Sequence, residues 1–237
     1  MLQCRPLLAH AQHVFTSRDV RLREDEQEWT GVAAVVGLDP SRLRFIRQVH
    51  GRSVAIVRTQ DATPWNRPEA DALISDDPDS AICVRVADCA PILLVDTRTN
   101  HVGAVHAGWR GAAKGVVAQA VRALSDEFGS RPADLMVAIG PCLGSCCAEV
   151  GADVVDAFRL GGHAEDEISR WFRRGRGDRW QLDLPGANRD QLKKQGVRDE
   201  FIFDAGLCTR THSTRFHSYR ADGGSAGRMA AVIRKKG

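Results

Sequence analysis

The stretch Ala81–Phe128, AICVRVADCAPILLVDTRTNHVGAVHAGWRGAAKGVVAQAVRALSDEF, decides the fold of this chain. Its first half contains short apolar runs, which predict strands over 81–86, 91–96 and 101–106. Its second half repeats apolar residues at helical spacing, which predicts a helix over 113–128 that ends at a glycine. Turn residues separate these elements, so we expect Cys89 and His106 to lie at strand ends.

The remainder of the chain mixes helices and strands without strict alternation. Apolar spacing predicts helices over 29–36, 151–160 and 185–195, and strands over 43–49, 53–57, 135–139 and 200–204. The charged segment 170–179 predicts an exposed loop, and 216–231 combines turn and helix signals. This irregular order favours an α+β fold over a doubly wound sheet. We therefore expect residues 1–237 to form a single domain of mixed β-sheets flanked by helices.

The composition is that of an ordinary globular protein. Of 237 residues, 43% are hydrophobic and 27% are charged, which is enough apolar material for one large core. A net charge of +3 is too small to indicate a nucleic-acid binder. No run approaches the roughly 18 apolar residues of a membrane span, and the start lacks the apolar region of a secretory signal. Seven cysteines without such a signal predict free thiols, and hence a soluble cytoplasmic protein.

Side chains that could bind a metal or act in catalysis occur in three segments that contain Gly or Pro: Gln48–Gly51, Ala87–Pro91 and His106–Gly111. His50, Cys89 and His106 offer two imidazoles and one thiolate, one ligand short of a closed structural zinc site. Such a set leaves one coordination position open for water or substrate, and zinc there would lower the pKa of a bound water. The same residues also suit a metal-free cysteine hydrolase, with Cys89 as nucleophile and His106 as its base. A zinc ion that only stabilises the fold is the non-enzymatic alternative.

Other residues are weaker candidates. Arg110 lies in a Gly-rich turn before the predicted helix, which suits binding of an anionic substrate group. Asp71 and Asp88 are candidates for substrate binding, for orienting a ligand or for proton transfer. A further cysteine group lacks the paired Cys-x-x-Cys spacing, so we interpret it as loop packing rather than a second metal site: Cys142, Cys146 and Cys147.

A series of motifs resembles, in order, the laccase-domain family, once described as multicopper polyphenol oxidases. The resemblance runs from about Leu43 to the C-terminus and rests on Gln48–Gly51, Ala87–Leu94, His106–Gly111, Ile139–Pro141, Glu149–Val150, Leu182–Leu184, Cys208–Thr209, Ser218–Arg220 and Gly227–Ala230. It implies a single α+β domain similar to bacterial toxin deamidases that use a Cys and His pair. It also implies that His50, Cys89 and His106 ligate zinc.

The resemblance implies a zinc-dependent purine nucleoside phosphorylase that uses phosphate and acts on adenosine, inosine and methylthioadenosine. It further implies hydrolytic deamination of adenosine. An alternative, from a bacterial branch of the family, is a peptidoglycan-editing hydrolase that removes a wrongly added L-serine from a UDP-muramyl precursor. Copper is the alternative metal, but eight histidines, two of them in the motifs, are too few for a multicopper oxidase. We expect a monomer without nucleic-acid or membrane partners. Ala148 stands where many relatives carry Tyr, which affects pocket shape.

Overall fold

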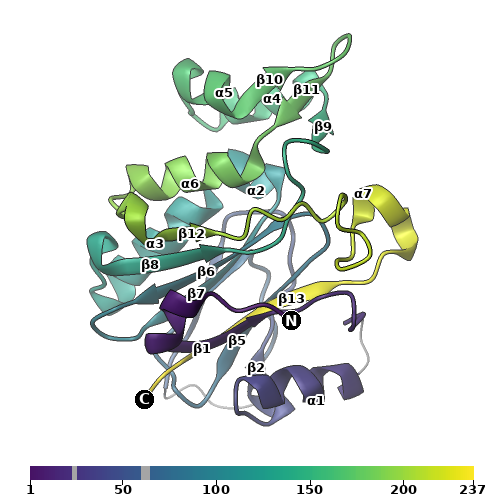
Figure 1. The fold of residues 1–237 in the computed structure, drawn as a ribbon. Coiled ribbons are helices and arrows are strands. Elements are labelled where there is room, and N and C mark those ends of the chain that lie inside the picture. The colour runs from purple at the N-terminus through teal and green to yellow at the C-terminus, as the bar shows by residue number, and fades with distance from the viewer. Residues whose placement is uncertain (23–25, 60–64) are drawn as a thin grey trace.

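The computed structural model describes residues 1–22, 26–59 and 65–237, and two stacked β-sheets form its centre (Figure 1). The larger sheet has six strands in the order β12 (Ile202–Asp204), β8 (Leu135–Ile139), β6 (Ala90–Asp96), β7 (Val102–Ala107), β4 (Ala72–Ser75) and β3 (Val54–Val57). The second sheet has four strands in the order β1 (Ala11–Phe15), β13 (Met229–Lys235), β5 (Ala81–Val86) and β2 (Leu43–Arg44). Both sheets are mixed, since β12–β8, β3–β4 and β2–β5 pair in parallel and the other pairs are antiparallel.

Helices cover the outer faces of the two sheets. One face of the larger sheet packs against α2 (Trp109–Ala113), α3 (Val116–Phe128) and α6 (Leu184–Lys194). The outer face of the smaller sheet packs against α1 (Glu26–Val35). A peripheral unit beyond α6 combines α4 (Ala152–Leu160), α5 (Glu165–Trp171) and a three-stranded sheet of β10 (Phe172–Arg174), β11 (Trp180–Leu182) and β9 (Glu149–Val150) (Figure 1).

The remaining elements are short. A single turn of helix, α7 (Tyr219–Asp222), precedes the last strand, β13. The 3-10 helices are η1 (Arg5–Ala9), η2 (Pro40–Arg42), η3 (Pro132–Asp134), η4 (Asp199–Phe201) and η5 (Gly223–Ser225). No helix in the described part of the chain has the length and apolarity needed to cross a bilayer.

Strand β6 shows why this region of the sequence is so apolar. Every residue of β6 is buried, because the helices cover one face of its sheet and the smaller sheet covers the other. Ile92 and Leu94 pack in the cluster with α3, whereas Leu93 and Val95 pack between the sheets. Successive side chains of a strand point to opposite faces, so two covered faces require a continuous apolar run.

The structure confirms the α+β class with mixed sheets flanked by helices, and it confirms the strands predicted in the opening stretch to within one residue. The helix predicted over 113–128 is wrong in one respect, because two helices occupy this region. Gly115 has a left-handed backbone, with φ of 75°, and it separates α2 from α3. The predicted Gly-rich turn is also wrong beyond Gly108, since Trp109 begins α2.

Other differences come from pairings between distant segments. The strand predicted over 43–49 ends at Arg44, and the predicted loop over 170–179 contains β10 and the turn of a hairpin with β11. Strands β1 and β13 were not predicted at all. Strand β13 lies between β1 and β5, and these partners come from the opposite end and the middle of the chain. Its local sequence carries no sign of that pairing.

Candidate metal centre

Strand register brings the three candidate ligands to one end of the larger sheet. In the antiparallel β6–β7 pair, His106 is opposite Pro91, so Cys89 lies beside the end of β7. Strand β4 is antiparallel to β7, and β3 is parallel to β4, so the segment before β3, which carries His50, reaches the same end. Three segments that are well separated in the sequence therefore meet at one edge.

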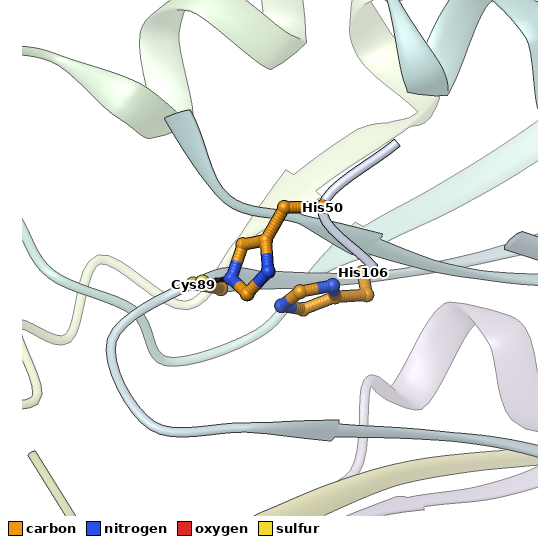
Figure 2. Close-up of side chains that lie close together, drawn as sticks. All are labelled: His50, Cys89 and His106. Atoms are coloured by element: carbon orange, nitrogen blue, oxygen red, sulfur yellow. Dashed lines mark hydrogen bonds between the residues drawn. The ribbon is translucent and has the colours of Figure 1, made fainter. Parts of the chain in front are cut away.

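The side chains of His50, Cys89 and His106 converge there (Figure 2). Their ligand atoms all lie within 4.8 Å of one another, and Cys89 Sγ is 3.9 Å from His50 Nε2. The imidazole centroids are 4.8 Å apart, with the rings inclined at 75°. Tetrahedral zinc bound to one sulfur and one nitrogen holds these atoms about 3.5 Å apart. The Cys89–His50 separation thus exceeds that of a zinc site by a few tenths of an ångström, and the three side chains supply suitable zinc ligands with a fourth position open.

Asp71, which is fully buried, orients both histidines. Its Oδ1 accepts hydrogen bonds from His106 Nδ1 at 2.8 Å and from the His50 amide at 2.9 Å. Its Oδ2 accepts from the amides of Gly51 at 2.5 Å and Val49 at 3.3 Å. Burial raises the pKa of this carboxyl, but the hydrogen bonds outweigh burial and lower it. With Nδ1 of His106 engaged, Nε2 is the ring atom left to bind a metal, as in carboxylate–histidine–zinc arrangements.

The electrostatics of Cys89 and His106 favour a thiolate beside an imidazolium when no metal is bound. Burial by itself raises the pKa of the Cys89 thiol, but the charge of His106 and hydrogen bonds to His106 and His50 lower it to about 6. Burial lowers the pKa of His106, but the thiolate and Asp71 together raise it to about 9. A preformed thiolate suits both metal ligation and nucleophilic attack.

The backbone around the centre is in unusual conformations. His50 and Asp88 have positive φ angles, 55° and 86°, which non-glycine residues rarely adopt and which recur at functional sites. Gly108 is required by contact, because a Cβ there would lie 2.8 Å from Cys89 Sγ. Asp88 Oδ1 accepts a hydrogen bond from Thr209 Oγ1, and Oδ2 accepts one from the Arg220 amide, both at 2.6 Å. These bonds hold the turn that presents Cys89.

The three residues line a cavity of about 1040 Å³. Its lining includes five arginines, Arg47, Arg85, Arg110, Arg220 and Arg228. Among the described residues that line it, Asp88 is the single carboxylate, and both its oxygens already accept hydrogen bonds. Trp109 and Tyr219 add aromatic surface, and the guanidinium of Arg110 lies 4.2 Å from the Trp109 ring centroid. The cavity is therefore suited to a ligand with an anionic group and an apolar or aromatic part.

The structure thus groups most of the residues singled out from the sequence. Asp71 lies behind His106, and its burial favours the orienting role over direct contact with substrate. The hydrogen bonds of Asp88 favour the same role. Arg110 is exposed and lines the cavity, and Ala148 forms part of the wall. Sequence reasoning did not assign roles to the other four arginines or to Thr209, although Arg220 and Arg228 lie within the quoted motifs, because no local spacing connects them.

Fold and site together define a class, that of α+β proteins with an open His–Cys–His ligand group in an arginine-lined cavity. The chain belongs to the family described as multi-copper polyphenol oxidoreductase laccase, whose family model matches residues 17–236.

Several known proteins are similar to this chain in sequence or in structure. The purine nucleoside phosphorylase of Deinococcus radiodurans is 37% identical over 202 residues, which span 85% of this chain and 74% of that protein. The purine nucleoside phosphorylase YfiH of Shigella flexneri is 35% identical over 194 residues, or 82% of this chain and 74% of the relative. The crystal structure of the Bacillus licheniformis hypothetical protein YfiH superposes with a TM-score of 0.83 at 28% identity, and covers 95% of this chain and 91% of its own.

Proposed function

We propose that residues 1–237 act as one purine nucleoside phosphorylase domain, with its active site at His50, Cys89 and His106. The reaction joins a phosphate oxygen to C1′ of the ribose and breaks the bond from C1′ to the purine nitrogen, which leaves with the electron pair and is protonated. The observation that carries this proposal is the open three-ligand group inside an arginine-lined cavity of about 1040 Å³. The names of the relatives from Deinococcus radiodurans and Shigella flexneri support it.

Each part of the cavity has a role in this reaction. Arg110 binds phosphate, for which a planar bidentate donor is well suited, and the other arginines of the lining add positive charge to the cavity. The rings of Trp109 and Tyr219 provide a face for the purine. Asp71 keeps the metal-binding nitrogen of His106 directed at the centre. When bound, zinc supplies a Lewis acid that polarises a substrate group held against it.

We propose zinc rather than copper as the metal, because imidazole and thiolate are zinc ligands and three protein ligands with an open fourth position are the pattern of catalytic zinc sites. A multicopper oxidase needs several histidine-rich centres, and among the described residues the histidines that meet in a ligand group are His50 and His106. Elsewhere, His13 accepts a hydrogen bond from the Cys4 amide, and His163 and His217 bond to backbone carbonyls. Polyphenol oxidation is therefore not the activity that we propose.

The proposed substrates are adenosine, inosine and methylthioadenosine, with hydrolytic deamination of adenosine as a second activity of the same site. In the deamination, water adds to the amino-bearing carbon of adenine and ammonia leaves, which converts adenosine to inosine. All seven cysteines are free thiols, which supports a reducing compartment and hence the cytoplasm as the proposed location. We further propose that the protein acts as a monomer.

A second candidate is a metal-free amide hydrolase, such as one that removes L-serine from a UDP-muramyl precursor. The observation that favours it is the pairing of the Cys89 thiolate with His106. In this reaction, Cys89 Sγ attacks the amide carbon, and His106 protonates the leaving amine. Water then releases the acyl group and restores the thiol.

Product analysis separates these activities. Zinc-loaded protein, chelated protein and a Cys89→Ser variant are incubated with adenosine and phosphate, and adenine, ribose 1-phosphate and inosine are quantified. We expect adenine and ribose 1-phosphate in equal amounts from the zinc-loaded protein, and strong loss after chelation or in Cys89→Ser. A Cys4→Ser variant, altered at a thiol outside the cavity, serves as the matched control and retains activity. Absence of both products from zinc-loaded protein contradicts the proposal. In a parallel incubation with a UDP-muramyl–L-serine amide, release of L-serine by the chelated protein favours the second candidate.

A further inference from the structure

A second group of candidate metal ligands, made of three cysteines, lies outside the cavity. It is formed by Cys146, Cys147 and Cys208, whose Sγ atoms all lie within 4.8 Å of one another. The sulfurs of Cys146 and Cys147 are 3.7 Å apart. Tetrahedral zinc with Zn–S bonds of about 2.3 Å holds two sulfurs about 3.8 Å apart. The separation of the Cys146 and Cys147 sulfurs is therefore already that of two thiolates bound to the same zinc ion.

The backbone holds the two contributing segments in place without a metal. The Cys142 amide donates to the Leu207 carbonyl at 3.2 Å, and the Thr209 amide donates to the Cys142 carbonyl at 2.9 Å. The amide of Cys147 closes a turn onto the Gly144 carbonyl at 2.9 Å. Gly144 allows this turn to approach the other segment, because a Cβ there would lie 3.2 Å from Cys208 Cβ.

We propose that Cys146, Cys147 and Cys208 bind a second zinc ion, separate from the proposed catalytic centre, with water as the fourth ligand. Three thiolates are soft ligands and select zinc over magnesium or calcium. Cys146 is exposed and Cys147 is partly exposed, so an ion can enter from solvent, whereas the buried Cys208 anchors it to the body of the protein. A disulfide would join two of the sulfurs and leave the third without a role, whereas a metal explains why all three converge.

The position of this group gives the ion a structural role. Cys208 precedes Thr209, whose hydroxyl donates to Asp88 Oδ1 at 2.6 Å. The carbonyl of Cys147 accepts a hydrogen bond at 3.2 Å from Arg220 Nη1, and the Arg220 amide donates to Asp88 Oδ2. A zinc ion would link these two segments, which support the turn next to Cys89. The ion would therefore stabilise the part of the cavity wall that carries Cys89.

The test isolates this group in the 237-residue protein by means of a Cys89→Ser background, which removes the single thiolate of the other centre. The chelated protein is titrated with Co²⁺ alone, because thiolate ligation of cobalt produces an intense charge-transfer absorption whose strength follows the number of sulfurs bound. We expect a three-thiolate band in Cys89→Ser, and a weaker band together with loss of tight binding when Cys146→Ser is added. Addition of Cys4→Ser, at a thiol that is not part of the group, leaves the band unchanged.

The same variants are then loaded with Zn²⁺ alone, and bound metal and thermal unfolding are measured. We expect Zn²⁺ to raise the unfolding midpoint of Cys89→Ser, and Cys146→Ser to abolish this rise. Cys147→Ser, also on the accessible turn, gives a second variant that spares the buried Cys208. The proposal is overturned if Cys89→Ser shows no thiolate–cobalt absorption, or if the band survives both Cys146→Ser and Cys147→Ser. It is also overturned if mass spectrometry finds a disulfide between Cys146 and Cys208 in protein isolated under reducing conditions. Since no turnover is measured, the outcome is independent of the proposed activity.

Discussion

Replacement of Asp71 by asparagine tests how the candidate metal centre is held together. The substitution preserves the size of the side chain but leaves one acceptor oxygen instead of two. If the amide nitrogen takes the place of Oδ2, it faces the donor amides of Gly51 and Val49. If it takes the place of Oδ1, it donates to His106 Nδ1 and moves the imidazole proton to Nε2, the atom needed for the metal.

Both orientations carry a measurable cost. Loss of the carboxylate behind a histidine ligand lowers metal affinity about 10- to 100-fold, or about 1.4–2.8 kcal/mol. A buried donor left unpaired costs about 1–3 kcal/mol of the unfolding free energy of the metal-free protein. We therefore expect Asp71→Asn to weaken zinc binding at the His50–Cys89–His106 centre by roughly one to two orders of magnitude, and to destabilise the fold modestly.

The assay is a competition titration of zinc against a chromophoric chelator, made in a Cys146→Ser background so that only the first centre contributes. Urea unfolding of the chelated protein measures the fold separately. Asp96→Asn is the matched control, because Asp96 is also fully buried and its Oδ1 accepts from the Arg98 amide at 2.8 Å. Its Oδ2 has no hydrogen-bond partner among the described residues, so replacing that oxygen by an amide nitrogen breaks no hydrogen bond. Equal zinc affinity in the Asp71 and Asp96 variants would refute the reasoning.

Four further predictions follow from the same geometry. Gly108→Ala places a Cβ 2.8 Å from Cys89 Sγ, so we expect displacement of the thiolate and about 100-fold lower turnover, measured as adenine release in an otherwise normally folded protein. In chelated protein, iodoacetamide modification of Cys89 should slow as the pH falls through about 6, because the thiol has a pKa of about 6 and is a reactive thiolate only above that pH. Peptide mass spectrometry at a series of pH values gives the midpoint of this change, and a midpoint near pH 8.5, as for an ordinary thiol, contradicts the prediction. Arg110→Ala should raise KM for phosphate about 10- to 100-fold with a smaller change in kcat, and an unchanged KM would remove Arg110 from the phosphate site. Thr209→Val leaves Asp88 without a 2.6 Å hydrogen bond and should cost about 1–3 kcal/mol in urea unfolding; no loss would show that the bond is dispensable.

Local pattern was sufficient for much of the fold. The apolar runs of the opening stretch predicted β5, β6 and β7 to within one residue, because a strand buried on both faces must be continuously apolar. Periodicity also predicted a helix ending at Gly129, where a glycine with positive φ terminates α3. It failed at the α2–α3 break, since the apolar spacing continues through Gly115.

The sequence by itself singled out the three candidate ligands, because His50, Cys89 and His106 each stand at or next to the end of a predicted strand, beside turn-forming residues. Only the tertiary structure decided what surrounds them. The register of β4 and β7 places Asp71 behind His106, and strand β13 pairs with segments from the other end and the middle of the chain. Hydrogen bonds and metal ligands act over a few ångströms in space, whereas the arginines of the cavity and the third thiol of the cysteine group come from distant parts of the chain. Their proximity is set by strand pairing and packing, which short-range sequence pattern does not encode.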